Sequence, residues 1–441
     1  MELIHNDPRL IVTDDEKVYM ASQPADIAER FNGMSRSDVV ALFTQLSIRY
    51  QVEVVSHLSE RNQIALATRL PRFRLASIVS AMDSDDRADF FNRMPEEAQQ
   101  QLLPALAYAE REDIRLLSSY DEGTAGSIMT SDYAFLSPGL TPVEAINTLR
   151  RIAPDAETVY HAYIVDDERK LLGTVSLRDL ILAAPSQTLE QLMVKDVISV
   201  TCDMDKEKVS QIVAHYDLMA LPVTNQDGQL LGIITHDDIL DVVTEEATED
   251  MHKSANIGKL TTSLKDASAT LLYKKRVVWL VLLVFGNIFS GAGIAHFEDI
   301  ITSYVALVFF LPLLIDSGGN AGSQSATLMV RALATGEVEL KDWSKMLSRE
   351  VFTSLALGLS MAAAVYGLGL YRGGADVAMV VGISMVIIVM VGSLVGTMLP
   401  FILHRLNLDP ASASAPMITS IADISGVLIY LAIASALLNI G

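Results

Sequence analysis

Five apolar segments occupy the second part of the chain and constrain its fold more than any other feature. They lie at about 277–297, 304–330, 351–371, 376–403 and 416–440. Each approaches or exceeds the roughly 20 residues that an α-helix needs to cross the hydrocarbon layer of a bilayer. We therefore expect a multi-pass membrane domain of five helices over residues 274–441.

The charge distribution divides the chain at the start of this region. Residues 1–273 contain 44 acidic and 24 basic residues, whereas residues 274–441 contain 10 and 9. The first part is typical of a soluble acidic domain, which argues against nucleic acid as a partner and favours cations. The single cysteine, Cys202, leaves no pair for a disulfide and suits a reducing compartment. The charged first 30 residues predict no secretory signal.

Basic residues predict the orientation of the membrane domain. They lie before the first apolar segment, between the second and third, and after the fourth: Lys274, Lys275, Arg276, Arg331, Lys341, Lys345, Arg349, His404 and Arg405. Loops rich in Lys and Arg remain on the cytosolic side of a membrane. We therefore expect a cytosolic N-terminal part and a C-terminus outside.

Asp423 lies inside the fifth apolar segment, in the stretch DPASASAPMITSIADISGVLIYLAIASALL (409–438). A carboxylate at membrane depth costs about 2.5–3.5 kcal/mol on insertion scales and usually marks an ion path or a proton relay. The alternative is an acid near a helix end that reaches the headgroups. Thr419 lies one turn before Asp423, and Gly426 allows close approach of another helix. An acid among hydroxyls and carbonyls, without thiols or paired imidazoles, suits a hard cation.

The second apolar segment contains Pro312, Gly318, Gly319 and Gly322, within the stretch LPLLIDSGGNAGSQSATLMVRALATG (311–336). Broken backbone at membrane depth is tolerated only inside protein or beside water, where freed carbonyls can face a cation. Close helix packing by small residues is the alternative. Because Asp316, Asn320 and Gln324 lie in the same stretch, we expect an interrupted helix beside a polar cavity.

A 12-residue period predicts a helical N-terminal domain over residues 1–123. Its apolar positions are Leu58, Leu70, Met82, Met94 and Leu106. Ser59, Pro71, Asp83 and Pro95 follow the first four and are typical of helix starts. Stacked short helices form a superhelical domain. Asp85 and Asp89 lie one turn apart on one helix face, either as solvated acids or as a cation site.

Residues 124–243 contain two copies of another unit. VYHAYIVDDERKLLGTVSLRDLI (159–181) matches DLMALPVTNQDGQLLGIITHDDIL (217–240), and each predicts strand, turn, strand and helix. Each copy has a hydroxyl residue three positions before an acid, Ser176 with Asp179 and Thr235 with Asp238. The pair resembles tandem CBS domains, an α/β fold that often binds adenine nucleotides. By that resemblance Arg178 and Asp179 are the nucleotide-binding candidates, although many CBS pairs bind only ions or nothing.

An acidic helix is predicted after the second copy, in DDILDVVTEEATEDMHK (237–253). Asp238, Asp241, Glu245 and Glu249 form one stripe at helical spacing. Like charges at this spacing destabilise a helix by about 0.2–0.5 kcal/mol per pair. A divalent ion bridging the stripe to another acidic surface would remove that cost, whereas a solvated face is the alternative. We expect this connecting helix, over 244–273, to run unbroken to Tyr273 and into the first apolar segment.

The combination resembles the MgtE family of bacterial magnesium channels over nearly the whole chain. The most specific stretches are GGNAGSQSATLMVRALATG (318–336), DPASASAPMITSIADISGVLIYL (409–431) and EEATEDMHK (245–253). The resemblance implies a homodimer in the inner (plasma) membrane, without catalytic activity, that takes up Mg²⁺ driven by the membrane potential. It implies a pore at the subunit interface, where Asp423 of each subunit binds hydrated Mg²⁺ beside Thr419 and Gly426. It also implies that the connecting helix closes the pore when cytosolic Mg²⁺ is high.

The same resemblance implies intracellular Mg²⁺ sites at nine acids: Asp85, Asp89, Asp205, Glu207, Asp217, Asp238, Glu246, Glu249 and Asp250. ATP is a possible regulatory ligand at Arg178 and Asp179. Two positions depart from the family pattern. Ala415 stands where relatives often have Gly or Asn, and Asp316 adds an acid beside the second segment. With Asn320, these two complete the predicted pore-lining set.

The sequence leaves three alternatives to magnesium uptake. Transport of Co²⁺, Mn²⁺ or Na⁺ is the nearest, because oxygen ligands disfavour softer metals but do not exclude Mn²⁺. An intramembrane aspartyl protease would use Asp316 and Asp423 as a dyad, yet neither lies in a GxGD context. A CBS-regulated membrane sensor without flux is the third.

Overall fold

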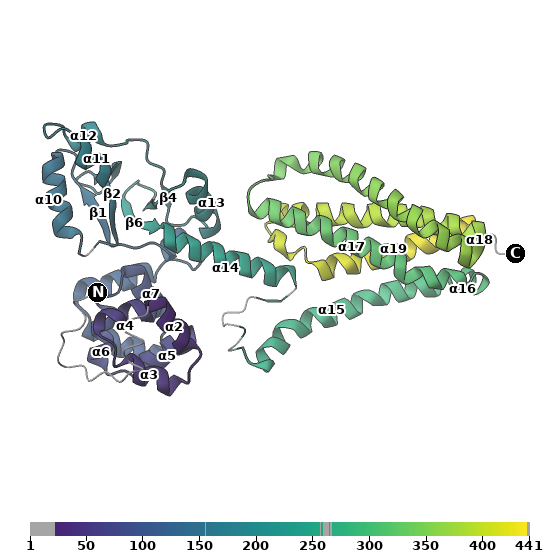
Figure 1. Ribbon diagram of the computed structural model, residues 1–441, viewed down its shortest axis with the longest axis horizontal. Coiled ribbons are helices and arrows are strands. Elements are labelled where there is room, and N and C mark those ends of the chain that lie inside the picture. The colour runs from purple at the N-terminus through teal and green to yellow at the C-terminus, as the bar shows by residue number, and fades with distance from the viewer. Residues whose placement is uncertain (1–22, 155, 256, 259–263, 265–266, 439–441) are drawn as a thin grey trace. The chain divides into compact units, whose positions relative to one another are not determined.

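The computed structural model describes residues 23–438 apart from 155, 256, 259–263 and 265–266. It divides into two compact units, residues 1–243 and 244–441. Figure 1 shows short helices and two small sheets in the first unit and long helices in the second. The predicted combination of a helical domain, a CBS pair and a region of long apolar helices is confirmed.

Short helices build the first 120 residues. They are α2 (Pro24–Asn32), α3 (Arg36–Phe43), α4 (Ile48–Ser56), α5 (Glu60–Arg69), α6 (Arg72–Val79), α7 (Ser84–Arg93), α8 (Glu96–Leu102), the 3₁₀ turn η1 (Leu103–Ala105) and α9 (Tyr108–Leu117). The five apolar residues of the 12-residue period are all buried in one core. Ser59, Pro71, Asp83 and Pro95 are the N-cap residues of α5 to α8, as the period predicted.

Two equivalent three-stranded sheets follow. The elements are η2 (Ala125–Ser127), β1 (Tyr133–Leu136), α10 (Pro142–Ile152), β2 (Thr158–Val165), β3 (Leu171–Ser176), α11 (Leu177–Leu182), α12 (Leu189–Leu192), β4 (Val200–Thr201), α13 (Lys206–Tyr216), β5 (Ala220–Thr224), β6 (Leu230–Thr235) and α14 (His236–Ser254). In each sheet the middle strand pairs parallel with the first and antiparallel with the third. The internal repeat therefore has the same topology in both copies.

The connecting helix is shorter than expected. α14 ends at Ser254, and the described residues between Ser254 and Ala269 are not helical. The prediction of an unbroken helix to Tyr273 is therefore wrong, and part of that stretch lies outside the described residues. Helical propensity is lower after the acidic stretch 237–253, because the sequence there contains Ser254, Gly258, Ser263 and Ser268.

The second unit contains four helices long and apolar enough to cross a membrane among the described residues. Its elements are α15 (Ala269–His296), α16 (Glu298–Ser303), α17 (Ala306–Ala334), η3 (Leu340–Asp342), α18 (Trp343–Arg405), η4 (Pro410–Ser412) and α19 (Ala415–Leu437). Gly374 interrupts α18 with φ 80° and ψ −174°. The two arms of α18 pack against each other, since a Cβ on Gly369 would lie 2.8 Å from the Cα of Ala378. The third and fourth predicted segments are these two arms.

The second apolar segment is a continuous helix, contrary to the prediction of an interrupted one. α17 retains helical backbone through Pro312 and the glycines. A Cβ on Gly392 or Gly396 of α18 would lie 2.2 or 2.0 Å from the carbonyl oxygen of Gly318 or Gly322. The glycines thus allow two helix backbones to touch, which is the small-residue packing described above as the alternative.

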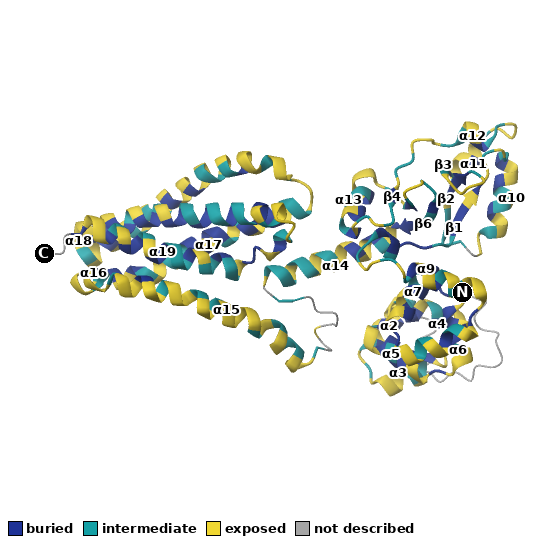
Figure 2. Cartoon of the chain, turned by 180° about the vertical axis from the view of Figure 1, so that it is seen from behind, coloured by how far each residue is buried: buried dark blue, intermediate teal, exposed yellow. Residues whose placement is uncertain are grey.

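Burial within the second unit is uneven. Figure 2 shows α15 exposed along most of its length, and Phe285 and Phe289 are 61% and 67% exposed. α17, α18 and α19 instead share a core that includes Phe310, Met385 and Tyr430. The exposed apolar surface of α15 is typical of a helix that contacts lipid or another chain in a membrane.

Candidate functional site

Three carboxylates from distant parts of the sequence meet in the first unit. Asp85, Glu157 and Asp238 each offer an oxygen atom, and these atoms lie within 4.8 Å of one another. Asp85 belongs to α7, Glu157 precedes β2, and Asp238 lies in the first turn of α14. The cluster therefore joins the helical domain to both CBS copies.

Local geometry holds the cluster in place. Asp238 Oδ2 accepts hydrogen bonds from the Thr235 hydroxyl and, at 3.3 Å, from the Thr235 N–H, so it caps the start of α14. Asp85 lies in the first turn of α7, where exposed N–H groups favour negative charge. The Glu157 N–H donates to the carbonyl of Asp132 over 2.8 Å.

An arginine on the opposite side of α7 holds this helix against the CBS region. The buried Arg87 lies 3.5 Å from Asp132 and 3.9 Å from Asp113, and donates to the carbonyl of Met82 over 3.1 Å. Its charge is already shared by these partners. The three clustered carboxylates consequently have no cation of their own among the contacts that the structure describes.

Burial and mutual repulsion raise the pKa values of the clustered acids. Burial is the main cause of the raised pKa of Asp85, followed by the charges of Asp238 and Glu157. Burial also raises the pKa of Glu157 to about 7 and that of Asp238 to about 6. In the absence of a cation, the cluster therefore holds protons at a pH where ordinary carboxyl groups have lost them.

The geometry fits a divalent cation. Oxygen ligands lie about 2.0–2.1 Å from Mg²⁺ and about 2.3–2.6 Å from Ca²⁺, so ligands on opposite sides of one ion are about 4–5 Å apart. Asp85 Oδ1 and Glu157 Oε2 are buried, and neither has a hydrogen-bond partner among the described residues. Unpartnered buried carboxylate oxygens are costly, and an ion bound between them would satisfy both.

Asp85 and Asp238 were predicted from the sequence as metal ligands, whereas Glu157 was not. That residue lies in the stretch DAETVY, which has no acidic periodicity and no capping pattern. Only the strand order places it beside Asp85. Asp89, by contrast, is exposed and pairs with Arg93 over 3.0 Å, so the two acids that share a helix face have different surroundings.

The predicted acids of the second CBS copy lie at the two ends of α13. Asp205 is the N-cap, and its Oδ1 accepts hydrogen bonds from the N–H groups of Glu207 and Lys208 over 2.9 and 3.4 Å. Asp217 ends the helix in a left-handed conformation with φ 51°. An 11-residue helix is about 16 Å long, so Asp217 cannot share an ion with Asp205 in the same chain.

The remaining predicted metal-binding acids lie on the second half of α14. Glu246, Glu249 and Asp250 are half-buried. Burial, with the nearby charge of Asp409, raises the pKa of Asp250 to about 6. Lys253 Nζ lies 2.7 Å from Glu249 Oε1 and also forms an ion pair with Asp409.

The candidate nucleotide residues are exposed. Arg178 and Asp179 lie in the first turn of α11, where the Asp179 N–H donates to the Ser176 hydroxyl over 3.1 Å. Thr235 and Asp238 have the corresponding positions in the second copy. In both copies the hydroxyl donates to the carboxylate three positions later, but only the second carboxylate belongs to the acid cluster.

Asp423 lies two turns inside α19 and is half-buried. Ser414 caps this helix by accepting from the Met417 N–H, and Ala415 and Pro416 form its first turn. The Thr419 hydroxyl donates to the carbonyl of Pro416 over 3.0 Å. Pro416 therefore starts the helix and does not kink it.

Helix α17 passes beside the same part of α19. A Cβ on Gly319 would lie 3.2 Å from Thr419, and one on Gly426 would lie 3.8 Å from the Cα of Ile315. Asp316 and Asn320 are exposed on α17 and share a hydrogen bond of 3.0 Å. Asp316 is close enough for its charge to act on Asp423. The structure thus brings together five of the six predicted pore residues at one helix contact, with Ala415 two turns away.

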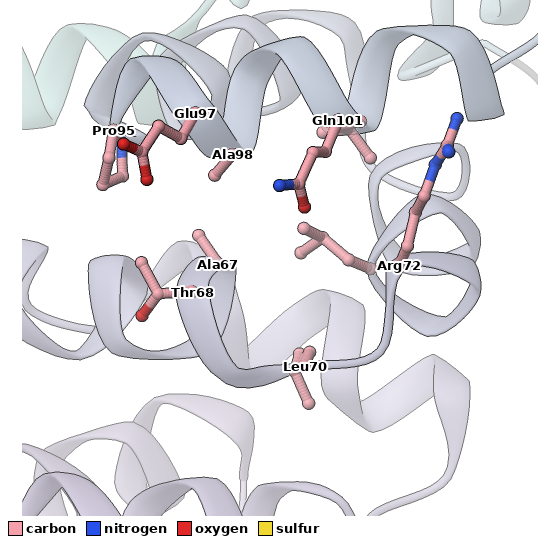
Figure 3. Close-up of a pocket in the computed structure, with 10 residues that line it drawn as sticks. Ala67, Thr68, Leu70, Arg72, Pro95, Glu97, Ala98 and Gln101 are labelled. Carbon is pink, nitrogen blue, oxygen red and sulfur yellow. The ribbon is translucent and has the colours of Figure 1, made fainter.

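A shallow cavity of about 160 Å³ lies elsewhere in the helical domain (Figure 3). Ala67, Thr68, Leu70 and Arg72 line one side, and Pro95, Glu97, Ala98 and Gln101 line the other. It contains a single carboxylate and shares no residue with the acid cluster. Its lining therefore does not match a divalent-cation site.

Comparisons with known proteins agree with this architecture. A family model described as MgtE intracellular N domain matches residues 22–123, CBS domain models match 125–186 and 189–245, and a model described as divalent cation transporter matches 311–433. The chain is 38% identical to magnesium transporter MgtE of Thermus thermophilus over 94% of this chain and 93% of that protein. It is 34% identical to magnesium transporter MgtE of Bacillus subtilis over 97% and 95%.

A solved structure agrees with the fold of the first unit. The cytosolic domain of the Mg²⁺ channel MgtE in complex with ATP is 36% identical, covers 51% of this chain and 92% of its own, and has a TM-score of 0.50. A CBS pair followed by a unit of long apolar helices that matches a divalent cation transporter model defines a membrane protein for divalent cations. The chain belongs to the MgtE family.

Proposed function

We propose that this protein carries Mg²⁺ across the bacterial inner membrane through a path that passes Asp423. The observation that supports this most strongly is a half-buried acid on an apolar helix, in a chain 38% identical to a magnesium transporter over nearly its whole length. The proposed activity is transport and not catalysis. The driving force is the membrane potential, which supplies about 4.6 kcal/mol per 100 mV for a divalent ion.

The proposed path is lined by Asp423, Thr419, Gly426, Ala415, Asn320 and Asp316. Mg²⁺ loses its water reluctantly. A path with two carboxylates, a hydroxyl and an amide can therefore hold the water shell of a hydrated ion more readily than the ion itself. Two copies of the chain, arranged as a homodimer, would double the number of carboxylates facing one ion. The exposed apolar face of α15 supports contact of this helix with lipid or with a second copy of the chain.

Cytosolic Mg²⁺ regulates the path in this proposal. It binds the cluster of Asp85, Glu157 and Asp238, and further ions bind the other predicted acids: Asp89, Asp205, Glu207, Asp217, Glu246, Glu249 and Asp250. Bound Mg²⁺ cancels the repulsion among these carboxylates, so the acidic surfaces come together and favour the shut state. Loss of Mg²⁺ restores the repulsion and favours the open state.

The proposal retains the predicted domains at residues 1–123, 124–243, 244–273 and 274–441. Within residues 244–273, α14 ends at Ser254, and the described residues between it and α15 are not helical. The N-terminus is cytosolic and the C-terminus outside, as the basic loops predict. Arg178 and Asp179 are candidates for a regulatory adenine nucleotide, because the MgtE cytosolic domain cited above was solved with ATP.

Ion flux in liposomes tests this function. Purified full-length protein is reconstituted with an internal Mg²⁺ indicator, and a potassium gradient with valinomycin sets an inside-negative potential. We expect Mg²⁺ entry that increases with voltage and exceeds entry of Co²⁺, Mn²⁺ and Na⁺. Equal or greater entry of Co²⁺ or Mn²⁺ would make this a transporter of another divalent cation. The absence of any cation flux would instead favour a CBS-regulated sensor.

A further inference from the structure

One basic residue joins the end of α14 to the connection between α18 and α19. Lys253 lies in the last turn of α14, and its side chain is only 28% exposed. Its ammonium group contacts Glu249 on its own helix and Asp409 at a sequence distance of 156 residues. Glu249 and Asp409 are 17% and 35% exposed, so the group is largely withdrawn from water.

The connection that carries Asp409 is firmly attached to the membrane helices. Asn407, with φ 57°, follows the C-cap residue of α18, and the other oxygen of Asp409 accepts a hydrogen bond from the Ala411 N–H over 2.8 Å. Ala411 and Ala413 are buried in a cluster with residues of α17 and α19. Ser414 follows and caps α19, the helix that carries Asp423. A displacement of Asp409 would therefore also displace the start of α19.

The charges explain why Lys253 matters for this contact. Glu249, Asp250 and Asp409 place three carboxylates around one ammonium. Without the ammonium, like charges would separate the end of α14 from the connection, unless another cation replaced it. Lys253 is a cation that belongs to the chain, so its contribution does not depend on the Mg²⁺ concentration.

We propose that Lys253 is a latch residue, whose ion pair with Asp409 holds the end of α14 on the base of α19 and stabilises the shut state independently of bound metal. This inference depends on the proposed function, because shut and open refer to the Mg²⁺ path. The latch sets how much internal Mg²⁺ is needed to stop flux. Without Lys253, a higher internal Mg²⁺ concentration would be needed to stop the flux.

Substitution of Lys253 tests the effect on flux. In the liposome assay, Lys253→Gln should raise the internal Mg²⁺ concentration for half-inhibition by about threefold to fivefold, as expected for a partly buried ion pair. Lys341→Gln is the matched control, because Lys341 pairs with Glu339 over 2.8 Å in the same unit but both side chains are mostly exposed. Internal Mg²⁺ should inhibit the control variant at the same concentration as the native protein. Equal inhibition in all three proteins would overturn the latch and leave the proposed function intact.

A charge exchange separates the pair from general effects of either residue. Lys253→Glu should raise the half-inhibitory concentration further than Lys253→Gln, since it adds a fourth carboxylate. Adding Asp409→Lys to Lys253→Glu should recover at least half of that change. If the double variant is no better than Lys253→Glu, the two side chains do not act as a pair and the proposal is wrong.

A crosslinking measurement tests the contact without any flux. Cys202 is the only cysteine, so a Cys202→Ala background accepts new cysteines at positions 253 and 409. A short bifunctional thiol reagent should link them within one chain at saturating Mg²⁺, where the shut state is populated, and peptide mass spectrometry identifies the link. Single-cysteine variants are the control. Failure to link at saturating Mg²⁺ would overturn the latch, whereas a link in a protein without Mg²⁺ flux would overturn only the proposed function.

Discussion

The acids of the two units have different surroundings, and the difference separates sensing an ion from conducting it. In the first unit, Asp85, Glu157 and Asp238 meet within 4.8 Å, and burial raises their pKa values. In the second unit, Asp423 is half-buried on an apolar helix and has one acidic neighbour, Asp316. Several buried carboxylates can bind an ion directly and hold it. A half-buried carboxylate with one close acidic neighbour can attract an ion and also release it, as conduction requires.

The largest expected effect is that of Asp423→Asn on Mg²⁺ flux. We expect Mg²⁺ flux in liposomes to fall about 100-fold or more, because the substitution removes the negative charge from the helix that lines the path. Asp299→Asn is the control, since Asp299 is an exposed acid of α16 in the same unit. Native flux in the Asp423→Asn variant would remove this residue from the path.

The contact between α17 and α18 holds the membrane acids in place, so it should tolerate no added methyl group. Gly396→Ala would bring a Cβ to 2.0 Å from the Gly322 carbonyl. We expect a loss of about 2 kcal/mol, or a decrease in Tm of about 4–8 °C in detergent. A Cβ on Gly367 in the same helix would have no neighbour within 4 Å. Gly367→Ala should therefore leave Tm unchanged, and equal Tm values for both variants would contradict this packing.

Glu157→Gln should change regulation and leave conduction intact. The variant loses one of three carboxylates that we assign to a sensing ion, so we expect the half-inhibitory internal Mg²⁺ concentration to rise about tenfold. Maximal flux at low internal Mg²⁺ should remain native. Glu168→Gln, an exposed acid of the same CBS copy, is the control. A fall in maximal flux without a change in inhibition would reverse the roles of the two units.

The effect of pH should be the smallest, and the acid cluster of the first unit should contribute most to it. The acids of the cluster have raised pKa values, so the folded protein holds more protons than the unfolded chain between about pH 4 and 7. Without divalent ions, stability should therefore fall as pH rises through this range. Mg²⁺ competes with those protons, so its addition should raise Tm more at pH 8 than at pH 5.5, by a few degrees.

Thermal unfolding of the full-length protein with and without Mg²⁺ measures this difference. The Glu157→Gln variant should show a smaller pH dependence than the native protein. An Mg²⁺-dependent Tm increase that is equal at both pH values would argue against direct binding to the three carboxylates.

Much of this architecture could be predicted because local patterns determine it. The 12-residue period corresponds to short helices whose apolar positions share one core, and the paired hydroxyl and acid of each CBS copy cap a helix. Glu157 could not be predicted, because its role depends on the strand order that places it beside Asp85 and Asp238.

Two errors in the prediction have a common physical origin. Pro312 and the glycines of α17 suggested a broken helix, yet glycine backbone remains helical when a neighbouring helix fills the space of the missing side chain. Conversely, the stripe of acids at helical spacing suggested a helix that continues to Tyr273, yet α14 ends at Ser254. The sequence shows which residues favour a helix, whereas tertiary contacts decide where that helix continues.

Inhibition by internal Mg²⁺ in a variant lacking the whole cluster tests the central claim most directly. Asp85→Asn, Glu157→Gln and Asp238→Asn are combined, and flux is measured over a series of internal Mg²⁺ concentrations. The separation of sensing from conduction predicts native flux at low internal Mg²⁺ and a half-inhibitory concentration raised by at least about tenfold. Native inhibition by internal Mg²⁺ in this variant would contradict it.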